Sequence, residues 1–353
     1  MREMTVAFVL TALLATTARS EEPIVVTPPT PEVPATAAPE TPTPADSPTP
    51  EEAQTSDAPA LEVKGFVDGS FVVPMSGYAK GSRGTILGLD QAEVDVIARP
   101  ASGVEIRIDL NWFPARSEIT FDSIVEQARV DLALGSGWFL RFGKLNAPLG
   151  IEMQDPTDMF QFSYSPIFSF AQPSNLTGLF VGWGGDAVEV QLFASNDWDT
   201  PSTPAGATAG ARVAVTAGDH VFGLTAMYGP VAQDDRRLLL DLDVSLVFGD
   251  LTLWVEGVLG QRESELGDTM SFGGTLKGNY KLGDHSVTLR GTYLKDEAGI
   301  GGSPELGETN LEVTAAWLFP IMPSVGGLVE VRADVYDEGD PVITGALELT
   351  ASF

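Results

Sequence analysis

Acidic and basic side chains stand at every second position in several segments of the sequence. In residues 104–113, Glu105, Arg107 and Asp109 share one face of an extended chain, while Ile106 and Ile108 lie on the other. A row of carboxylate and guanidinium groups can attract, repel or pair with ions in water. This pattern predicts chemistry of ion binding and ion passage rather than bond cleavage.

Groups that could perform catalysis are sparse. The two histidines, His220 and His285, follow expected tight turns in different parts of the chain, so neither is expected to activate a Ser nucleophile. Paired carboxylates can activate water, but acids in external connections more often face solvent or bind divalent ions loosely. The sequence therefore predicts no enzyme activity, no cofactor and no dedicated metal site. The acids considered are Asp234, Asp235, Glu263, Glu265, Asp337, Glu338 and Asp340.

The elements that carry these side chains are predicted to be β-strands. From Leu61 to Phe353, about sixteen segments alternate apolar and polar residues, and none repeats at the helical period. The expected connections alternate strictly between short ones, such as 135–137, and long ones, such as 145–175 and 229–235. We expect an all-β fold, a transmembrane antiparallel up-and-down β-barrel of about 16 strands, within a range of about 14–18.

Aromatic residues on the apolar face fall near the expected strand ends. Trp112 and Tyr293 lie at the end with long connections, and Trp138, Trp183 and Trp317 at the end with tight turns. Aromatic rings with a polar edge favour the boundary between lipid and water. Two such girdles favour a membrane barrel over a soluble sandwich.

The composition divides the chain into three parts. It has 353 residues, no Cys and a net charge of −29, which argues against nucleic acid as a partner and excludes disulfides. Residues 1–20 have the basic, apolar and small-residue regions of a secretory signal peptide. Residues 21–60, rich in Pro, Thr and Glu, are predicted to be a disordered periplasmic segment, and residues 61–353 to be the barrel.

This organisation predicts an exported protein of the Gram-negative outer membrane. The expected partners around the barrel are outer-membrane lipid and lipopolysaccharide. The last segment alternates up to Phe353, like the C-terminal signal with which barrel-assembly machinery pairs as an edge strand, so that machinery is a further expected partner.

Short motifs follow one another through residues 86–182. They are Leu89-Asp90-Gln91-Ala92-Glu93, Glu126-Gln127-Ala128, Phe142-Gly143-Lys144, Pro148-Leu149-Gly150-Ile151-Glu152, Phe162-Ser163-Tyr164-Ser165, Ala171-Gln172-Pro173 and Thr177-Gly178. Their order resembles the beta-barrel porin-2 (OmpL-like) family of Gram-negative outer-membrane porins. The resemblance implies a porin fold. The family tends to carry an Arg in the Tyr-Ser motif, where this chain has Pro166.

A barrel of this size normally encloses a water-filled lumen lined by the polar face of each strand. Acids outnumber bases on that face, which predicts a channel for ions and small hydrophilic solutes with weak cation preference. The alternative is that these charges pair and only solvate the wall. The predicted lining residues are Glu105, Arg107, Asp109, Arg129, Asp131, Arg141, Glu189, Arg212, Asp241, Asp243, Glu256, Lys277, Arg290, Glu312, Glu330, Arg332 and Asp334.

The long connection at residues 145–175 combines acids with aromatic residues. In general porins, which this topology resembles, the connection after the fifth strand folds inward and narrows the pore. We expect the same here, with the acids facing basic wall residues such as Arg107, Arg129 and Arg141, so that a transverse field sets selectivity. The predicted constriction residues are Glu152, Asp155, Asp158, Phe160, Phe162 and Tyr164.

Two alternatives concern this same connection. It could instead pack on a neighbouring subunit, since a homotrimer is expected by analogy with porins. It could also fill the barrel completely, and the protein would then be a non-conducting barrel with a structural or adhesive surface role.

Overall fold

The computed structural model describes residues 60–76, 86–113, 124–198, 206–232, 235–264, 267–300, 307–337 and 340–353. The predicted signal peptide at 1–20 and the predicted disordered segment, apart from its last residue, lie outside the described residues. So do the predicted external acids Asp234, Glu265 and Glu338.

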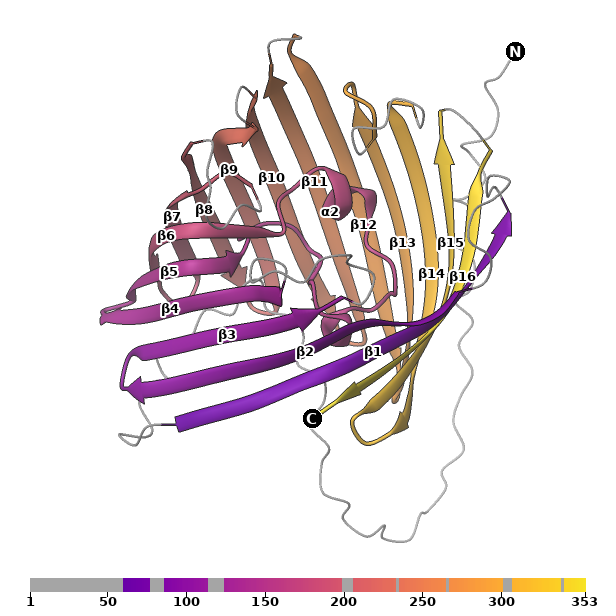
Figure 1. Ribbon diagram of the computed structural model, residues 1–353, viewed down its shortest axis with the longest axis horizontal. Coiled ribbons are helices and arrows are strands. Elements are labelled where there is room, and N and C mark those ends of the chain that lie inside the picture. The colour runs from indigo at the N-terminus through magenta and orange to yellow at the C-terminus, as the bar shows by residue number, and fades with distance from the viewer. Residues whose placement is uncertain are drawn as a thin grey trace, which may run out of the picture. The chain divides into compact units, whose positions relative to one another are not determined.

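Antiparallel strands form a closed barrel in which each strand pairs with its sequence neighbours and β1 pairs with β16 (Figure 1). The closed order of 16 strands confirms the predicted fold class. The strands are β1 (Ala60–Ser76), β2 (Ile86–Ala101), β3 (Val104–Trp112), β4 (Val125–Gly135), β5 (Trp138–Asn146), β6 (Asn175–Gly184), β7 (Val188–Ser195), β8 (Thr208–Ala217), β9 (His220–Ala232), β10 (Asp235–Phe248), β11 (Leu251–Glu263), β12 (Thr269–Leu282), β13 (His285–Asp296), β14 (Thr309–Met322), β15 (Val325–Tyr336) and β16 (Val342–Ser352).

Alternation along each strand separates an apolar outer surface from a charged inner one. In β3, Ile106, Ile108 and Leu110 are 36–40% exposed, whereas Arg107 and Asp109 are 8% and 0% exposed. Closure pairs the backbone of every strand on both sides, which a wall facing lipid requires because lipid offers no hydrogen bonds. The exposed aromatic residues Trp112 and Trp138 stand at strand ends, the last residue of β3 and the first of β5.

The predicted strict alternation of short and long connections is wrong at one place. Strand β9 ends at Ala232 and β10 begins at Asp235, so residues 233–234 join them instead of 229–235. The ladder continues through Gly229 and Pro230, which pair with Arg237 and Arg236. Gly229 and Pro230, which suggest a turn in the sequence, therefore belong to β9, because β10 pairs with them.

Bulges interrupt the alternation on β2 and β4. On β4, Gln127 pairs with Asp109 and Val125 with Leu110, so Glu126 has no counterpart on β3. An extra residue of this kind re-aims its side chain, and Val125, Glu126 and Gln127 are all buried. On β2, the register similarly skips Asp90 opposite Asp68 and Gly69 of β1.

Two short helices, η2 (Pro156–Asp158) and α2 (Pro166–Phe170), lie between β5 and β6. No helix within the described ranges is long and apolar enough to cross a membrane. Helix α2 contacts β12 and β13, and Ile167 is fully buried in an apolar cluster on the inner side of the wall. The cluster consists of Leu145, Ile167, Ala171, Leu176, Phe180, Phe193, Met227, Leu239, Val258, Leu294 and Ile300.

Candidate functional site

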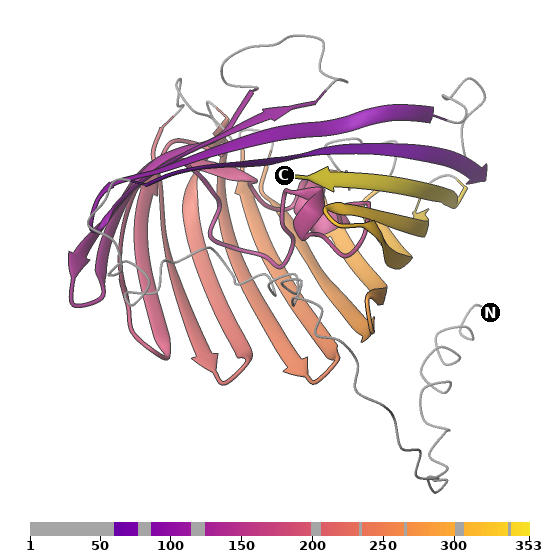
Figure 2. The ribbon, with the colours of Figure 1, turned by 90° about the horizontal axis from the view of Figure 1, so that it is seen from below.

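Residues 147–174, which connect β5 to β6, are called the inner segment here. Figures 1 and 2 show this segment, including α2, inside the ring of strands in both views. Its contacts with strands on several sides of the barrel define the candidate site.

The start of the inner segment is bound to β8, β9 and β10. The carbonyl oxygen of Pro148 accepts hydrogen bonds from Arg212 Nη1 at 3.3 Å and from Thr225 Oγ1 at 2.9 Å. The amide of Gly150 donates to Asp241 Oδ1 at 3.1 Å. Backbone groups that would otherwise be buried without partners are thereby satisfied by wall side chains.

Gly150 allows the chain to turn close against the wall. Its φ is +81°, and a Cβ there would lie 2.8 Å from Gln172 Nε2 and 3.0 Å from Glu256 Oε1. Glycine adopts this conformation without the steric cost of a side chain. The residue type therefore sets how closely the inner segment approaches β11.

Arg290 of β13 holds the middle of the inner segment. It donates to Glu152 Oε1 at 2.6 Å and to the carbonyl oxygen of Ser163 at 2.6 Å. On the wall it pairs with Glu312 of β14 at 3.1 Å, and the side chains of all three charged residues are 0% exposed. Glu152 also accepts hydrogen bonds from the Ser165 amide at 2.7 Å and Gln161 Nε2 at 2.9 Å.

The charge state of Glu152 follows from two opposing effects. Burial alone would raise its pKa, but Arg290 and then Lys277 favour the carboxylate and bring the pKa below its ordinary value. Glu152 is therefore an anion that is fixed in place by cations and hydrogen-bond donors.

Strand β15 binds the next part of the inner segment. Glu330 accepts hydrogen bonds from the amides of Phe162 at 2.8 Å and Ser163 at 3.2 Å. Arg332 donates to the carbonyl oxygen of Tyr164 at 2.6 Å. The segment is therefore bonded to β8–β10 at one side and to β13–β15 at the other.

Aromatic contacts complete the packing of the segment. Phe160 packs against Trp254 of β11 with ring centroids 5.3 Å apart. Tyr164 stacks on Phe168 at 4.6 Å, and its hydroxyl donates to the carbonyl oxygen of Gln154 at 2.6 Å. These rings lie on the inner side of the barrel rather than on its lipid-facing surface.

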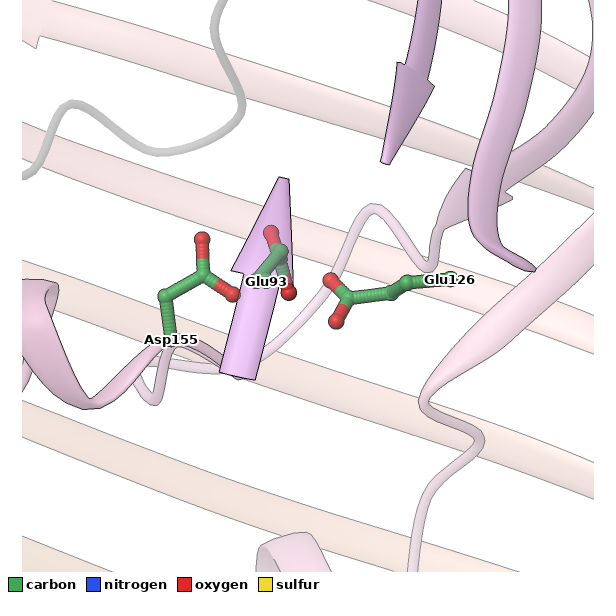
Figure 3. Close-up of side chains that lie close together, drawn as sticks. All are labelled: Glu93, Glu126 and Asp155. Carbon is green, nitrogen blue, oxygen red and sulfur yellow. The ribbon is translucent and has the colours of Figure 1, made fainter. Parts of the chain in front are cut away.

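Three carboxylates from separate elements meet where the inner segment passes β2 and β4. Glu93 of β2, Glu126 of β4 and Asp155, which precedes η2, each offer an oxygen within 4.8 Å of the other two. In Figure 3, Glu93 lies between Asp155 and Glu126. Burial, followed by the negative charge of Glu126, raises the pKa of Asp155 well above its ordinary value.

The wall arginines pair mainly with wall carboxylates. Arg107 contacts Asp109 at 2.8 Å and Asp95 at 3.3 Å. Arg212 contacts both carboxylate oxygens of Asp243, at 2.6 and 2.8 Å. Arg129 lies 3.2 Å and Arg141 3.6 Å from Asp131. These guanidinium groups are thus neutralised by carboxylates of the wall itself.

The structure places the predicted lining residues on the inner surface, with Glu105, Arg129, Glu189 and Arg332 half-buried and the others buried. The acids on the inner segment were predicted to face basic wall residues such as Arg107, Arg129 and Arg141; the basic wall residue that Glu152 meets is Arg290. Asp158 is exposed at the end of η2.

The two histidines, and the external acids Asp235 and Glu263, have partners outside this site. His220 Nδ1 accepts a hydrogen bond from the Val247 amide at 3.1 Å, while His285 stacks on Trp317 at 5.7 Å. Asp235 pairs with Arg262, and Glu263 accepts a hydrogen bond from Tyr228 at 3.0 Å.

Sequence reasoning missed Glu126 because strict alternation assigns it to the lipid face when Gln127, Arg129 and Asp131 point inward. The bulge on β4 overrides that assignment. Glu126 and Gln127 are two consecutive polar residues at the start of a strand. This pair was the available signal of a bulge, since exposing either side chain to lipid is costly.

The sequence matches a known family, and the fold is similar to solved structures. The family described as "Putative beta-barrel porin-2, OmpL-like" matches residues 100–334. No curated protein matches the sequence. OmpF of Salmonella typhi, solved in complex with daunomycin, is similar with a TM-score of 0.68 and 12% identity, covering 84% of this chain and 98% of that one.

Two further solved structures have similar folds. The outer membrane channel DcaP of Acinetobacter baumannii has a TM-score of 0.63 and 12% identity, covering 85% of this chain and 99% of that one. An anion-selective porin from Comamonas acidovorans has a TM-score of 0.61 and 12% identity, covering 84% and 100%. At these identities the likeness concerns the fold.

Proposed function

Because the chain belongs to the beta-barrel porin-2 (OmpL-like) family, we propose that it is an outer-membrane channel through which ions and small hydrophilic solutes diffuse passively. The inner surface supports this proposal, since charged residues of nearly every strand face inward while the outer surface is apolar. The inner segment would narrow the passage and set its selectivity.

We further propose a weak cation preference, carried by one observation. Among the described residues, Arg107, Arg129, Arg141, Arg212, Arg290 and Arg332 all pair with carboxylates, whereas Asp68, Glu256 and Glu348 form no ion pair. Where these carboxylates are ionised, no Arg neutralises them, and they give the inner surface excess negative charge that attracts cations. The similar fold of an anion-selective porin is compatible with this, because selectivity depends on side chains rather than on the barrel.

Planar-bilayer recording tests both proposals. Purified protein is expected to give conductance steps that grow with KCl concentration, and a zero-current potential in a salt gradient with the sign of cation preference. Asp68→Asn with Glu348→Gln should move that potential toward zero, while Asp284→Asn at an exposed turn should leave it unchanged. An unchanged potential in the double variant contradicts the assignment of selectivity.

A non-conducting barrel with a structural or adhesive role is the second candidate. It is favoured by the inner segment's bonds to both β8–β10 and β13–β15, and by the apolar cluster around α2. Absence of conductance at high protein input would support this candidate and contradict the channel.

We also propose a homotrimer, as in the trimer form of OmpT from Vibrio cholerae, which has a TM-score of 0.60 and 11% identity and covers 84% of this chain and 100% of that one. We also propose export by a signal peptide, assembly through β16 and the Phe353 that follows it, and contact with lipopolysaccharide. Sedimentation in detergent measures the oligomer, and a monomer would contradict the trimer.

A further inference from the structure

The carboxylates of Glu93, Glu126 and Asp155 lack a cationic partner. Among the described residues, none of the three forms an ion pair with Lys, Arg or His. Three carboxylates at this separation cannot all be ionised without a neutralising charge, because like charges in a poorly solvated place repel strongly. Either protons or a bound cation must therefore neutralise them.

Buried atoms without hydrogen bonds point to a ligand. Glu93 is 2% exposed, and its Oε1 has no hydrogen-bond partner. Asn111 is also 2% exposed; its Nδ2 donates to Glu126 Oε2 at 2.6 Å, and its Oδ1 is without a partner. Buried polar atoms are normally satisfied, so these oxygens call for a proton or a bound cation to complete them.

The second group of acids nearby is already neutralised. Glu93 also lies within 4.8 Å of Asp95 and Asp109, but both of these pair with Arg107. The uncompensated charge is therefore that of Glu93 together with Glu126 and Asp155, which lie on either side of it (Figure 3).

The all-carboxylate set of ligands favours calcium as the cation. Calcium binds oxygen at about 2.3–2.6 Å in flexible geometry, so two of its ligands can lie up to about 5 Å apart, whereas magnesium demands octahedral geometry and gives up its water reluctantly. The three oxygens lie within 4.8 Å of one another, which is inside the span of a single calcium ion. Carboxylates are its usual ligands, and water can supply the remaining positions.

We propose that Glu93, Glu126 and Asp155 bind one Ca²⁺ ion, which ties the inner segment to strands β2 and β4. Asn111 is a positioning residue that orients Glu126 through its amide. The ion would join two wall strands to a segment that is also bonded to β8–β10 and to β13–β15. Its effect on ion flow rests on the proposed channel function, but its binding does not.

Calorimetry on the full chain, folded in detergent and freed of metal by chelation, tests the binding. Titration with CaCl₂ is expected to show one site per chain, and MgCl₂ a weaker one. Asp155→Asn and Glu93→Gln should each weaken Ca²⁺ binding by roughly tenfold or more, because each removes one charged ligand. Asp284→Asn, which removes an exposed carboxylate far from the site, should bind as the wild type does.

Two results would overturn the site. One is an absence of saturable Ca²⁺ binding to the wild type up to about 10 mM, above the weakest range of protein calcium sites. The other is unaltered binding in both variants. If the variants do not fold, the wild type still decides: its unfolding temperature must be higher in Ca²⁺ than in chelator.

Conductance separates this inference from the channel proposal. If the protein binds Ca²⁺ but conducts no ions, the calcium site is supported and the channel proposal is contradicted. If the protein conducts ions but binds no Ca²⁺, the channel proposal is supported and the calcium site is contradicted.

Discussion

Arg290 shows how a single residue can fix a segment inside a barrel. Its guanidinium group donates to Glu312 on the wall and to Glu152 and Ser163 on the inner segment, with no exposure of its side chain. A buried cation is tolerated only when several acceptors replace its water shell. Removing it would leave two buried carboxylates without their main partner.

Replacement of Arg290 by Met should therefore destabilise the protein by about 3–5 kcal/mol. The free energy of unfolding can be followed by tryptophan fluorescence in denaturant. Arg99→Met is the matched control, because Arg99 pairs with Glu62 and Glu105 while 47% exposed, and should cost at most about 1 kcal/mol. Equal losses in the two variants would show that Arg290 does not hold the segment.

Asp155 should make stability depend on pH in the absence of divalent cations. Its pKa in the folded protein is raised by burial and by Glu126, so the folded state favours the protonated form. This contribution to stability is present below the ordinary pKa of about 4 and is lost as pH rises above it. Asp155→Asn should therefore be more stable than the wild type at pH 7, with the difference vanishing near pH 4.

Thermal unfolding from pH 4 to pH 8 in chelator measures this difference. Added Ca²⁺ should reduce it at pH 7, because the ion compensates the charge only in the wild type. A variant that is less stable than the wild type at pH 7 in chelator would contradict the raised pKa.

At the scale of the element, bulges decide which side chains enter the site. Period-two alternation predicted the strands and the inner positions of most charged residues, because it follows from the geometry of an extended chain. It could not predict Glu126, since an extra residue in β4 shifts the register by one. The position of a bulge depends on the partner strand, which alternation within one strand does not encode.

The close approach of β4 and β5 depends on Gly143 of β5. A Cβ on Gly143, at φ +126°, would lie 2.1 Å from the Ala128 carbonyl oxygen, whereas Gly135, at φ +86°, has no atom within 4 Å of its Cβ position. Gly135→Ala should cost about 1–2 kcal/mol for its backbone conformation alone. Gly143→Ala should cost distinctly more, because the backbone of β4 must also move.

Denaturant titration of the two glycine variants, side by side, measures the two costs. Comparable stabilities would mean that the strands can separate locally and that the approach at Gly143 is not tightly constrained.

At the scale of the whole molecule, the net charge of −29 and the unpaired inner carboxylates act together on permeating ions. Salt screens such charges over about 10 Å at 0.1 M and about 3 Å at 1 M. Cation preference, measured as zero-current potential at a fixed concentration ratio, should therefore fall as the mean salt concentration rises. A preference that does not change with salt would point to size exclusion rather than to charge.

The barrel could be predicted from the sequence, but the partners of the inner segment could not. Strand pairing joins neighbours in sequence, so local patterns and connection lengths suffice. Arg290 and Glu152 are separated by 138 positions, and Phe162 and Glu330 by 168. Which of several inner arginines meets Glu152 depends on the path of residues 147–174 through the barrel, which periodicity does not determine.

The bonds of the inner segment to β8–β10 and to β13–β15 have a mechanical consequence. A ring of strands resists stretching along its hydrogen bonds but flattens more easily when squeezed from the side. The inner segment is bonded to separated parts of the ring through Arg212, Arg290 and Glu330, so it resists that flattening. The same residues that shape the passage thereby keep its cross-section constant under the lateral pressure of the bilayer.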